Sequence, residues 1–300
     1  MAVCSTSMAL GKTKAQAIIA ETVSPSPQPN GELTLAHTNS LEQALPSSEP
    51  GKAVIIFTFD DGHASDYLLA YPILKPYDIK GTSYINTKYT DQGLKGRLSW
   101  DQIREMAGYG WVFGAHTSGH QRMTRLTDKE IASDCEAVNQ SFIAQGFAPP
   151  VIMAYPYGAH SDRVIKAMKP FYKQARLAAY RTDCVDPANT DPYKIPSVSA
   201  DMQTKGRLNK VKRLVDKACE KSAVVIFRVH VLYKDHPYDT VKRNSRVAGG
   251  CAPQTDSKLF AELVEYCAKK GCAFMTMTEL MDNMDAQQAA DSQRYNHASR

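Results

Sequence analysis

Apolar residues along the chain gather in short runs that are separated by helical patterns. The first run, V-I-I-F-T-F at 54–59, predicts a strand covered on both faces, because apolar and β-branched residues follow one another without polar alternation. Similar runs predict further strands at 81–86, 111–115, 151–154, 174–179, 195–199, 223–229 and 272–277. The chain is therefore expected to contain a sheet whose strands are mostly buried.

Helices are predicted between the strands, where apolar residues recur every three or four positions. Two of them begin with a capping-box sequence, Ser99 with Gln102 and Thr127 with Glu130. The expected helices cover 65–75, 99–108, 127–146, 161–169, 208–218 and 258–270. Strand and helix alternate through about seven units, which favours an α/β fold with a parallel sheet closed into a barrel over an open doubly wound sheet.

The two ends of the chain differ in composition from its middle. Residues 21–50 are rich in Pro, Ser, Asn and Gln, so a flexible leader is expected over 1–50. A single catalytic domain is expected over 51–283, with a polar tail over 284–300. No run of about 18 apolar residues occurs, so no membrane span is expected.

Charge and cysteine content narrow the classes of partner and compartment. The net charge of +5 is too small to indicate nucleic-acid binding. Seven cysteines without a C-x-x-C pair indicate free thiols in a reducing compartment. Lys12 and Lys14 interrupt the first 20 residues, which therefore make a poor secretory signal. These features point to the cytoplasm.

Candidate chemistry begins at Asp60 and Asp61, which directly follow the first strand and precede Gly62. Two adjacent carboxylates at a buried strand end are costly unless a cation such as a metal ion neutralises them. They could instead form a turn that caps the next helix, with Gly62 supplying a positive φ. Within this stretch alone, the two interpretations are equally good.

Three other predicted strands also end in reactive groups, which separates the two interpretations. His116 and His120 follow one strand at a spacing that lets both imidazoles reach one ion if the segment turns helically. Tyr157 and His230 follow two others. Parallel strands bring their carboxyl ends to one mouth of a barrel. Two histidines and an aspartate are typical of catalytic zinc sites, so the metal site is favoured.

Four segments carry a resemblance to a known family. They are T-F-D-D-G at 58–62, H-T-S-G-H at 116–120, A-Y-P-Y-G at 154–158 and R-V-H at 228–230. In order and type they resemble the motifs of the polysaccharide deacetylases, carbohydrate esterase family 4, over about residues 51–280. The resemblance implies a distorted (β/α) barrel of seven or eight parallel strands. It also implies an acetylated carbohydrate substrate.

The resemblance also implies roles for individual residues. Asp61, His116 and His120 would hold a divalent metal, usually zinc, with cobalt, nickel or manganese as other candidates. Asp60 would be the general base and His230 the general acid. The backbone N–H of Tyr157 would help to form the oxyanion hole. Further substrate contacts are expected from a short segment that consists of Pro156, Tyr157 and Gly158.

The polar partners of the base and the acid stay open at this stage. Many family members carry an arginine where Ala154 stands, so the group that orients Asp60 is uncertain; Arg181 and Arg228 are the candidates. The carboxylate that raises the pKa of His230 is to be found among Asp183, Asp186 and Asp201. Three other histidines near the motifs are expected to be structural or to line the substrate groove: His63, His160 and His236.

Three functions agree with these observations. The leading one is the removal of N-acetyl groups from an N-acetylhexosamine polymer or oligomer, and the A-Y-P-Y-G segment at 154–158 resembles the branch that acts on poly-N-acetylglucosamine. An O-acetyl esterase or a cyclic-amide hydrolase would use the same metal site. A carbohydrate-binding protein without activity is disfavoured, because binding has no need for Asp60. Substrates of this family lie mostly in the cell envelope or outside the cell, whereas the free cysteines point to the cytoplasm. The sequence does not indicate an oligomeric state.

Overall fold

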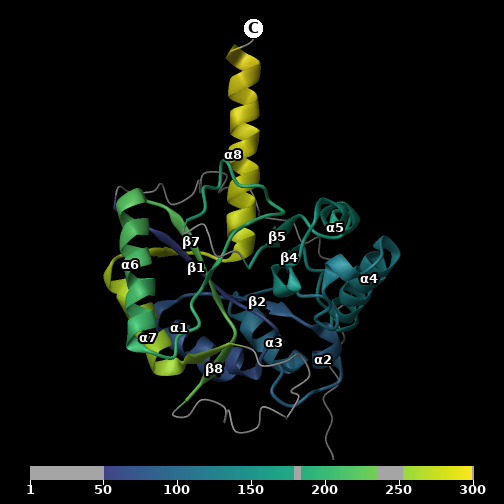
Figure 1. Ribbon diagram of the computed structural model, residues 1–300, viewed down its shortest axis with the longest axis horizontal. Coiled ribbons are helices and arrows are strands. Elements are labelled where there is room, and N and C mark those ends of the chain that lie inside the picture. The colour runs from purple at the N-terminus through teal and green to yellow at the C-terminus, as the bar shows by residue number, and fades with distance from the viewer. Residues whose placement is uncertain (1–50, 179–183, 235–252, 299–300) are drawn as a thin grey trace, which may run out of the picture. The chain divides into compact units, whose positions relative to one another are not determined.

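The computed structural model describes residues 51–178, 184–234 and 253–298 (Figure 1). The expected leader over 1–50 lies outside the described residues, as do Arg181, Asp183 and His236. The strands are β1 (Val54–Phe59), β2 (Thr82–Ile85), β3 (Val112–Ala115), β4 (Ile152–Ala154), β5 (Gln174–Arg176), β6 (Val198–Ser199), β7 (Val224–Val229), β8 (Val231–Tyr233), β9 (Gln254–Asp256) and β10 (Ala273–Phe274).

Helices follow most of the strands. The α-helices are α1 (Tyr71–Leu74), α2 (Thr87–Asp91), α3 (Trp100–Gly108), α4 (Asp128–Ala144), α5 (Asp162–Met168), α6 (Lys205–Lys221), α7 (Ser257–Lys269) and α8 (Met277–Ala298). Shorter helical turns cover Asp66–Ala70, Lys75–Tyr77, Met123–Arg125 and Pro156–Gly158. Both predicted capping boxes are present, because the Ser99 and Thr127 hydroxyls accept the N–H groups of Gln102 and Glu130.

The main sheet is a curled parallel sheet in the order β5-β4-β3-β2-β1-β7-β6, and β10 pairs with the first half of β1. Arg176 of β5 forms a parallel bridge with Ile195. Ile195 lies three residues before the start of β6, and β6 pairs with β7. The segment 195–199 thus links the two ends of the curl. The predicted distorted (β/α) barrel is confirmed.

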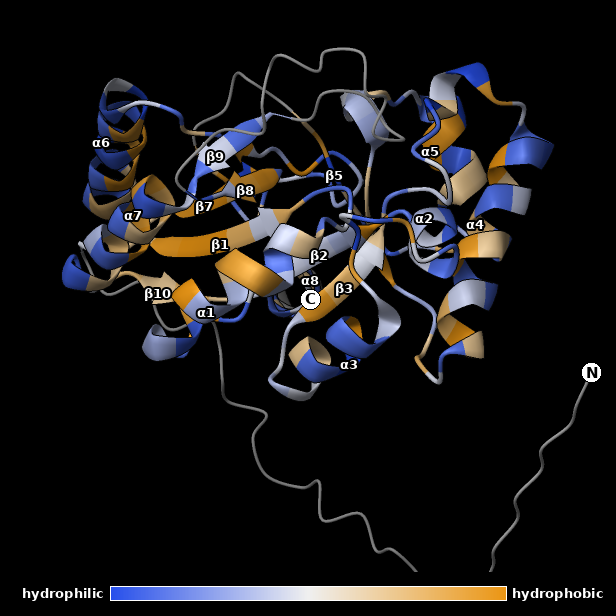
Figure 2. Ribbon diagram, turned by 90° about the horizontal axis from the view of Figure 1, so that it is seen from below, coloured by the Kyte–Doolittle hydropathy of each residue, from blue (hydrophilic) through white to orange (hydrophobic). Residues whose placement is uncertain are grey.

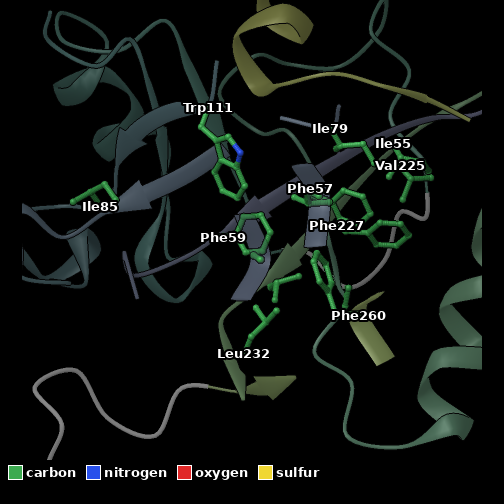
Figure 3. Close-up of a cluster of buried hydrophobic side chains, with 14 of the residues drawn as sticks. Ile55, Phe57, Phe59, Ile79, Ile85, Trp111, Val225, Phe227, Leu232 and Phe260 are labelled. Atoms are coloured by element: carbon green, nitrogen blue, oxygen red, sulfur yellow. The ribbon is translucent and has the colours of Figure 1, made fainter. Parts of the chain in front are cut away.

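Side chains of β1 alternate between two cores, as expected for a strand covered on both faces. Ile55, Phe57 and Phe59 face the helices, and Figure 3 shows Phe57 beside Phe227 and Phe260 there. We call this layer between sheet and helices the outer core. Val54 and Ile56 face the inside of the curl, with residues of β2, β4, β7 and the start of α8, which we call the inner core.

The helices cover the outside of the sheet in pairs, with α6 against α7 and α4 against α5 (Figure 1). Figure 2 shows the hydrophobic colour along β1, β3 and β7, while the covering helices carry hydrophilic residues on their other faces. Among the described helices, none has the length and apolar character needed to cross a membrane.

The C-terminal part differs from the prediction in two ways. The strand expected over 272–277 is limited to β10, and α8 begins at Met277. The tail expected over 284–300 is largely helical, since α8 continues to Ala298. The reason is local: Ala, Gln, Met and Arg favour helix, and no Gly or Pro interrupts the sequence after Gly271.

Candidate active site

The candidate site lies at the carboxyl edge of the sheet, where four strands end. Asp60 follows β1, His116 follows β3, Pro156 follows β4 and His230 follows β7. The parallel register places these ends side by side, so residues far apart in sequence become neighbours. The expected convergence is therefore present in the structure.

The turn after β1 separates its two aspartates. Asp61 and Gly62 both have a left-handed backbone, with φ of 73° and 62°. Arg97 Nη1 donates to the carbonyl of Asp61 at 2.6 Å and holds this turn from the following segment. The next helical turn begins only at Asp66, and Ser65 precedes it. The interpretation of the pair as a helix cap is thus not supported.

Asp61 points toward both histidines of the second motif. Its Oδ1 lies 3.4 Å from His116 Nε2 and 3.2 Å from His120 Nε2, and this oxygen is buried without a hydrogen-bond partner. Its Oδ2 lies 3.3 Å from His63 Nε2. Burial raises the pKa of Asp61, but the neighbouring imidazoles of His116 and His63 outweigh this and hold the pKa well below its usual range. Asp61 is an ionised carboxylate.

The other ring nitrogens of the two histidines are fixed by different partners. His116 Nδ1 lies 2.7 Å from the carbonyl of Ala154, and His120 Nδ1 lies 3.1 Å from the hydroxyl of Tyr157. Burial, together with the nearby His116, lowers the pKa of His120 to about 4, so its imidazole is neutral at neutral pH. Both Nε2 atoms are consequently available as ligands.

The loop between the histidines is a tight turn, whereas the prediction assumed a helical one. Thr117 and His120 have φ values of 58° and 57°, which no helix contains. The Ser118 N–H donates to Asp134 of α4 at 3.0 Å, and the Asn86 amide donates to the carbonyl of His116 at 2.5 Å. These contacts replace helical hydrogen bonds and still bring the two rings together.

The donor set fits a divalent metal ion. One oxygen and two nitrogens lie within 4.8 Å of one another, and the orphaned Asp61 oxygen faces both nitrogens. An ion bonded to two such atoms at about 2.1 Å separates them by roughly 3.4 Å in a tetrahedral site. The measured separations of 3.4 and 3.2 Å from Asp61 to His116 and His120 agree with this value.

Asp60 is not part of the group formed by Asp61, His116 and His120, and it forms a buried ion pair with Arg176 of β5. Arg176 also donates to the Ser197 hydroxyl at 2.9 Å, and its guanidinium lies 5.0 Å from the centre of the Tyr84 ring. Burial raises the pKa of Asp60, but the nearby positive groups, Arg176 foremost, together outweigh this and lower it. Neither arginine proposed from the sequence forms this pair: Arg181 lies outside the described residues, and the charge of buried Arg228 has a smaller influence than that of Arg176.

The sheet register explains how Arg176 reaches Asp60. Arg176 is the direct neighbour of Ala154 in the parallel pairing of β4 with β5. The guanidinium therefore comes from the strand next to the position where many family members carry their arginine. The sequence analysis missed Arg176. Its position within a buried strand was the signal that its charged side chain faces inward.

His230 lies across from Asp60, with 3.9 Å between His230 Nε2 and Asp60 Oδ2. Its Nδ1 lies 3.2 Å from both carboxylate oxygens of Asp201, whose Oδ1 also accepts the His230 N–H at 3.0 Å. Burial acts to lower the pKa of His230, but Asp201 outweighs this and raises it. Asp186 instead accepts hydrogen bonds from Ala188 and Asn189, so Asp201 is the partner among the described candidates.

Tyr157 has a strained backbone and a highly exposed side chain, with φ of 60° and 56% of its surface exposed. Its ring packs between His120 and Arg122, whose guanidinium lies 4.6 Å from the ring centre. Pro156 is buried, and Gly158 also has a positive φ, where a side chain would approach Ala178 to 3.0 Å. The backbone of this segment is thus fixed beside His120, which the Tyr157 ring and hydroxyl contact.

Positive φ values are concentrated in this site. Six non-glycine residues of the described ranges have a positive φ, and four of them lie here: Asp61, Thr117, His120 and Tyr157. Such strain is common where function requires a fixed geometry. Two of the histidines expected to be structural or to line the substrate groove contact residues of the site: His63 contacts Asp61, and His160 Nδ1 lies 3.0 Å from the carbonyl of Gly158.

Comparisons with known proteins agree with this geometry. Residues 47–173 match the family model for polysaccharide deacetylase. YxkH of Bacillus subtilis, which is named for the same family, is 30% identical over 138 residues, covering 46% of this chain and 49% of that protein. The poly-beta-1,6-N-acetyl-D-glucosamine N-deacetylase of Staphylococcus epidermidis is 28% identical over 174 residues, covering 53% of this chain and 60% of that protein. The chain thus spans about half the length of these relatives.

A solved structure supports the fold. The structure of the peptidoglycan deacetylase PdaC from Bacillus subtilis is similar, with a TM-score of 0.51. It is 17% identical, and the match covers 82% of this chain and 98% of that one. At this identity the similarity shows a shared barrel and nothing about the substrate.

Proposed function

Because residues 47–173 match the polysaccharide deacetylase family model, we propose that the chain is a metal-dependent hydrolase that removes N-acetyl groups from an N-acetylhexosamine-containing poly- or oligosaccharide. The observation that carries this proposal is the division of labour between adjacent aspartates. Asp61 faces the two histidines, while Asp60 is paired with Arg176 and faces His230. A binding protein would have no use for the second carboxylate.

Asp61, His116 and His120 would hold the metal, for which zinc suits a set of two histidines and one carboxylate. Cobalt, nickel or manganese could occupy the same ligands. When bound, a divalent ion supplies Lewis acidity, which polarises a carbonyl oxygen and lowers the pKa of nearby water. His63 would keep Asp61 oriented for this task through the contact with Oδ2.

Asp60 would act as the general base. Its ionised carboxylate takes a proton from the water that attacks the amide carbonyl of the N-acetyl group. The buried ion pair with Arg176 fixes the carboxylate and keeps it ionised before the reaction. Arg176 is itself held by Ser197 and Tyr84, so the base rests on a rigid support.

Tyr157 would stabilise the negative charge that develops on the carbonyl oxygen, and His230 would protonate the leaving amine. The Tyr157 N–H donates to the carbonyl oxygen as negative charge develops there, a contribution of about 3 kcal/mol in comparable sites. His230 is protonated with the help of Asp201 and gives its Nε2 proton to the leaving amine. The amide and one water molecule thus become acetate and a free amine.

The test is an acetate-release screen with zinc-loaded protein. We expect acetate from at least one of chitin oligomers, peptidoglycan and poly-N-acetylglucosamine, with no turnover of imides or acetyl esters at comparable rates. Release only from acetyl esters would assign an O-acetyl esterase, and opening of an imide alone would assign a cyclic-amide hydrolase. Carbohydrate binding without any turnover would indicate a binding protein, and each of these results would overturn the proposal.

A further inference from the structure

Three cysteines gather at the opposite edge of the barrel from the candidate active site. Cys219 lies in the last turn of α6, Cys267 near the end of α7, and Cys272 directly before β10. The sulfur atoms of Cys219 and Cys272 are 3.9 Å apart, although 53 positions separate these residues along the chain. The three elements therefore bring together thiols that no local sequence pattern would pair.

Both cysteines of the close pair are anchored next to the start of β1. The N–H of Ala273 donates to the carbonyl of Ala53 at 2.9 Å, and the N–H of Val54 donates to the carbonyl of Ala223 at 3.0 Å. Backbone hydrogen bonds thus hold the segments after Cys219 and after Cys272 on the same strand. The sheet thus brings the backbones that carry the two thiols to the same place.

The pair differs from Cys267 in access, and Cys272 differs from both other members of the cluster in acidity. Cys219 and Cys272 keep 9% and 7% of their surface exposed, whereas Cys267 has none. Hydrogen bonding with Cys267 and Cys219 lowers the pKa of Cys272, although burial acts in the other direction. Burial raises the pKa of Cys135 to about 12. Cys272 therefore has the greater thiolate fraction and is the better nucleophile at neutral pH.

We propose that Cys219 and Cys272 form an oxidisable dithiol that closes to a disulfide across the base of the barrel. With hydrogen peroxide as oxidant, the Cys272 thiolate attacks one peroxide oxygen and hydroxide leaves, which gives a sulfenic acid. The Cys219 sulfur then attacks the Cys272 sulfur, and water leaves as the S–S bond forms. Overall the two thiols lose two hydrogen atoms, and peroxide is reduced to two molecules of water.

This disulfide would act as a redox-dependent staple. It would join α6 to β10 and close a loop of the 53 positions between them, which restricts the unfolded chain more than a short loop would. The linked segments lie at the amino edge of β1, away from Asp60. We expect the oxidised form to unfold at a higher temperature and to keep the arrangement of the candidate active site.

The test compares the whole chain before and after treatment with hydrogen peroxide at low protein concentration. After unfolding and alkylation, the reduced chain should carry a label on each of its seven cysteines. The oxidised chain should carry two labels fewer, and peptide mapping should find Cys219 joined to Cys272. Its melting temperature should rise by several degrees and return when a reductant is added.

Variants make the assignment specific. Cys219→Ser and Cys272→Ser should each abolish the linked peptide and the shift in melting temperature, while Cys135→Ser serves as the matched buried control and should retain both. Because the peptide map of the unaltered chain needs no variant, a substitution that fails to fold leaves the test intact. A map in which Cys272 pairs with Cys267, in which chains are joined to one another, or in which both thiols stay reduced would overturn the proposal.

Discussion

The inside of the barrel has two halves of opposite character, and β1 passes through both. In the half near its start, Val54 and Ile56 pack with three methionines of α8, Met277, Met281 and Met284. In the half near its end, the next residue after Thr58 on the same face of the strand is Asp60, which pairs with Arg176. The inward-facing side of β1 therefore meets apolar side chains near the start of the strand and charged side chains near its end.

The difference shows what each half contributes. The inner core has relaxed backbone and interchangeable apolar contacts, so changes there should alter stability alone. The upper half holds buried charge, which is costly unless each group has its partner. Changes there should alter function first, and the predictions below test this separation in order of the expected loss of activity.

The largest effect is expected from His116→Ala. This change removes one of the three proposed metal ligands, so both metal binding and acetate release should fall to background. Metal analysis of the purified protein together with the acetate assay checks this. The matched control is His160→Ala, which removes a nearby histidine outside the triad and should retain the metal. Metal retained in His116→Ala would place the ion elsewhere.

Asp60→Asn should separate metal binding from turnover. The amide keeps the shape of the side chain but takes no proton, so kcat should fall about 10²–10⁴-fold while metal content is unchanged. Steady-state acetate release and metal analysis are the measurements. Asp186→Asn, an exposed change with local contacts only, is the control. Near-normal turnover in Asp60→Asn would remove the proposed base.

Arg176→Ala should lower both the rate of acetate release and the stability of the protein. It leaves Asp60 buried without its cation, which should lower the free energy of unfolding by about 3–5 kcal/mol. The control is Arg163→Ala, which breaks the exposed ion pair with Asp128 and should cost less than about 1 kcal/mol. Denaturant titrations of the two variants should differ accordingly. Equal stability losses would mean that the Asp60–Arg176 pair has no special role.

Asp201→Asn should change the pH dependence of acetate release more than its maximum. Asp201 raises the pKa of His230, so the protonated acid persists to higher pH in the unaltered protein. Without that carboxylate the pKa of His230 falls, and the alkaline limb of kcat against pH should move to lower pH. The pH profile of the two proteins is the measurement, and an unmoved alkaline limb would contradict the role of His230.

The smallest effect on activity is expected from Met281→Ala in the inner core. Shortening this buried side chain leaves a cavity, so the free energy of unfolding should fall by about 2 kcal/mol. Metal content and kcat should stay the same. A fall in kcat without loss of folded protein would show that the two halves of the barrel are not separable.

The fold and the gathering of Asp61, His116 and His120 at one edge of the sheet could be predicted because their signals are local. A buried strand followed by Asp60 and Asp61, and a second one followed by His116, place these groups at one edge once the strands are parallel. Arg176 was missed because its contact with Asp60 spans 116 positions and depends on the pairing of β5 with β4. The pattern of apolar and polar residues does not indicate which residues of β4 and β5 pair.

The choice of Asp201 over Asp186 was hidden for the same reason. Ser199 of β6 lies opposite Arg228 of β7, and this pairing is what brings Asp201 next to His230. The sequence places the candidate carboxylates within one turn-rich stretch and offers no ranking. The loop between His116 and His120 likewise depends on Asn86 and Asp134, which come from other elements.

The central claim is that one metal ion held by Asp61, His116 and His120 supports deacetylation. It is tested most directly by titrating zinc into chelator-treated protein while acetate release from poly-N-acetylglucosamine, chitin and peptidoglycan oligomers is measured. We predict that release is absent before zinc is added and rises to a plateau at one zinc per chain. Acetate release that survives complete removal of metal, or none from any of these sugars at full zinc loading, would contradict the claim.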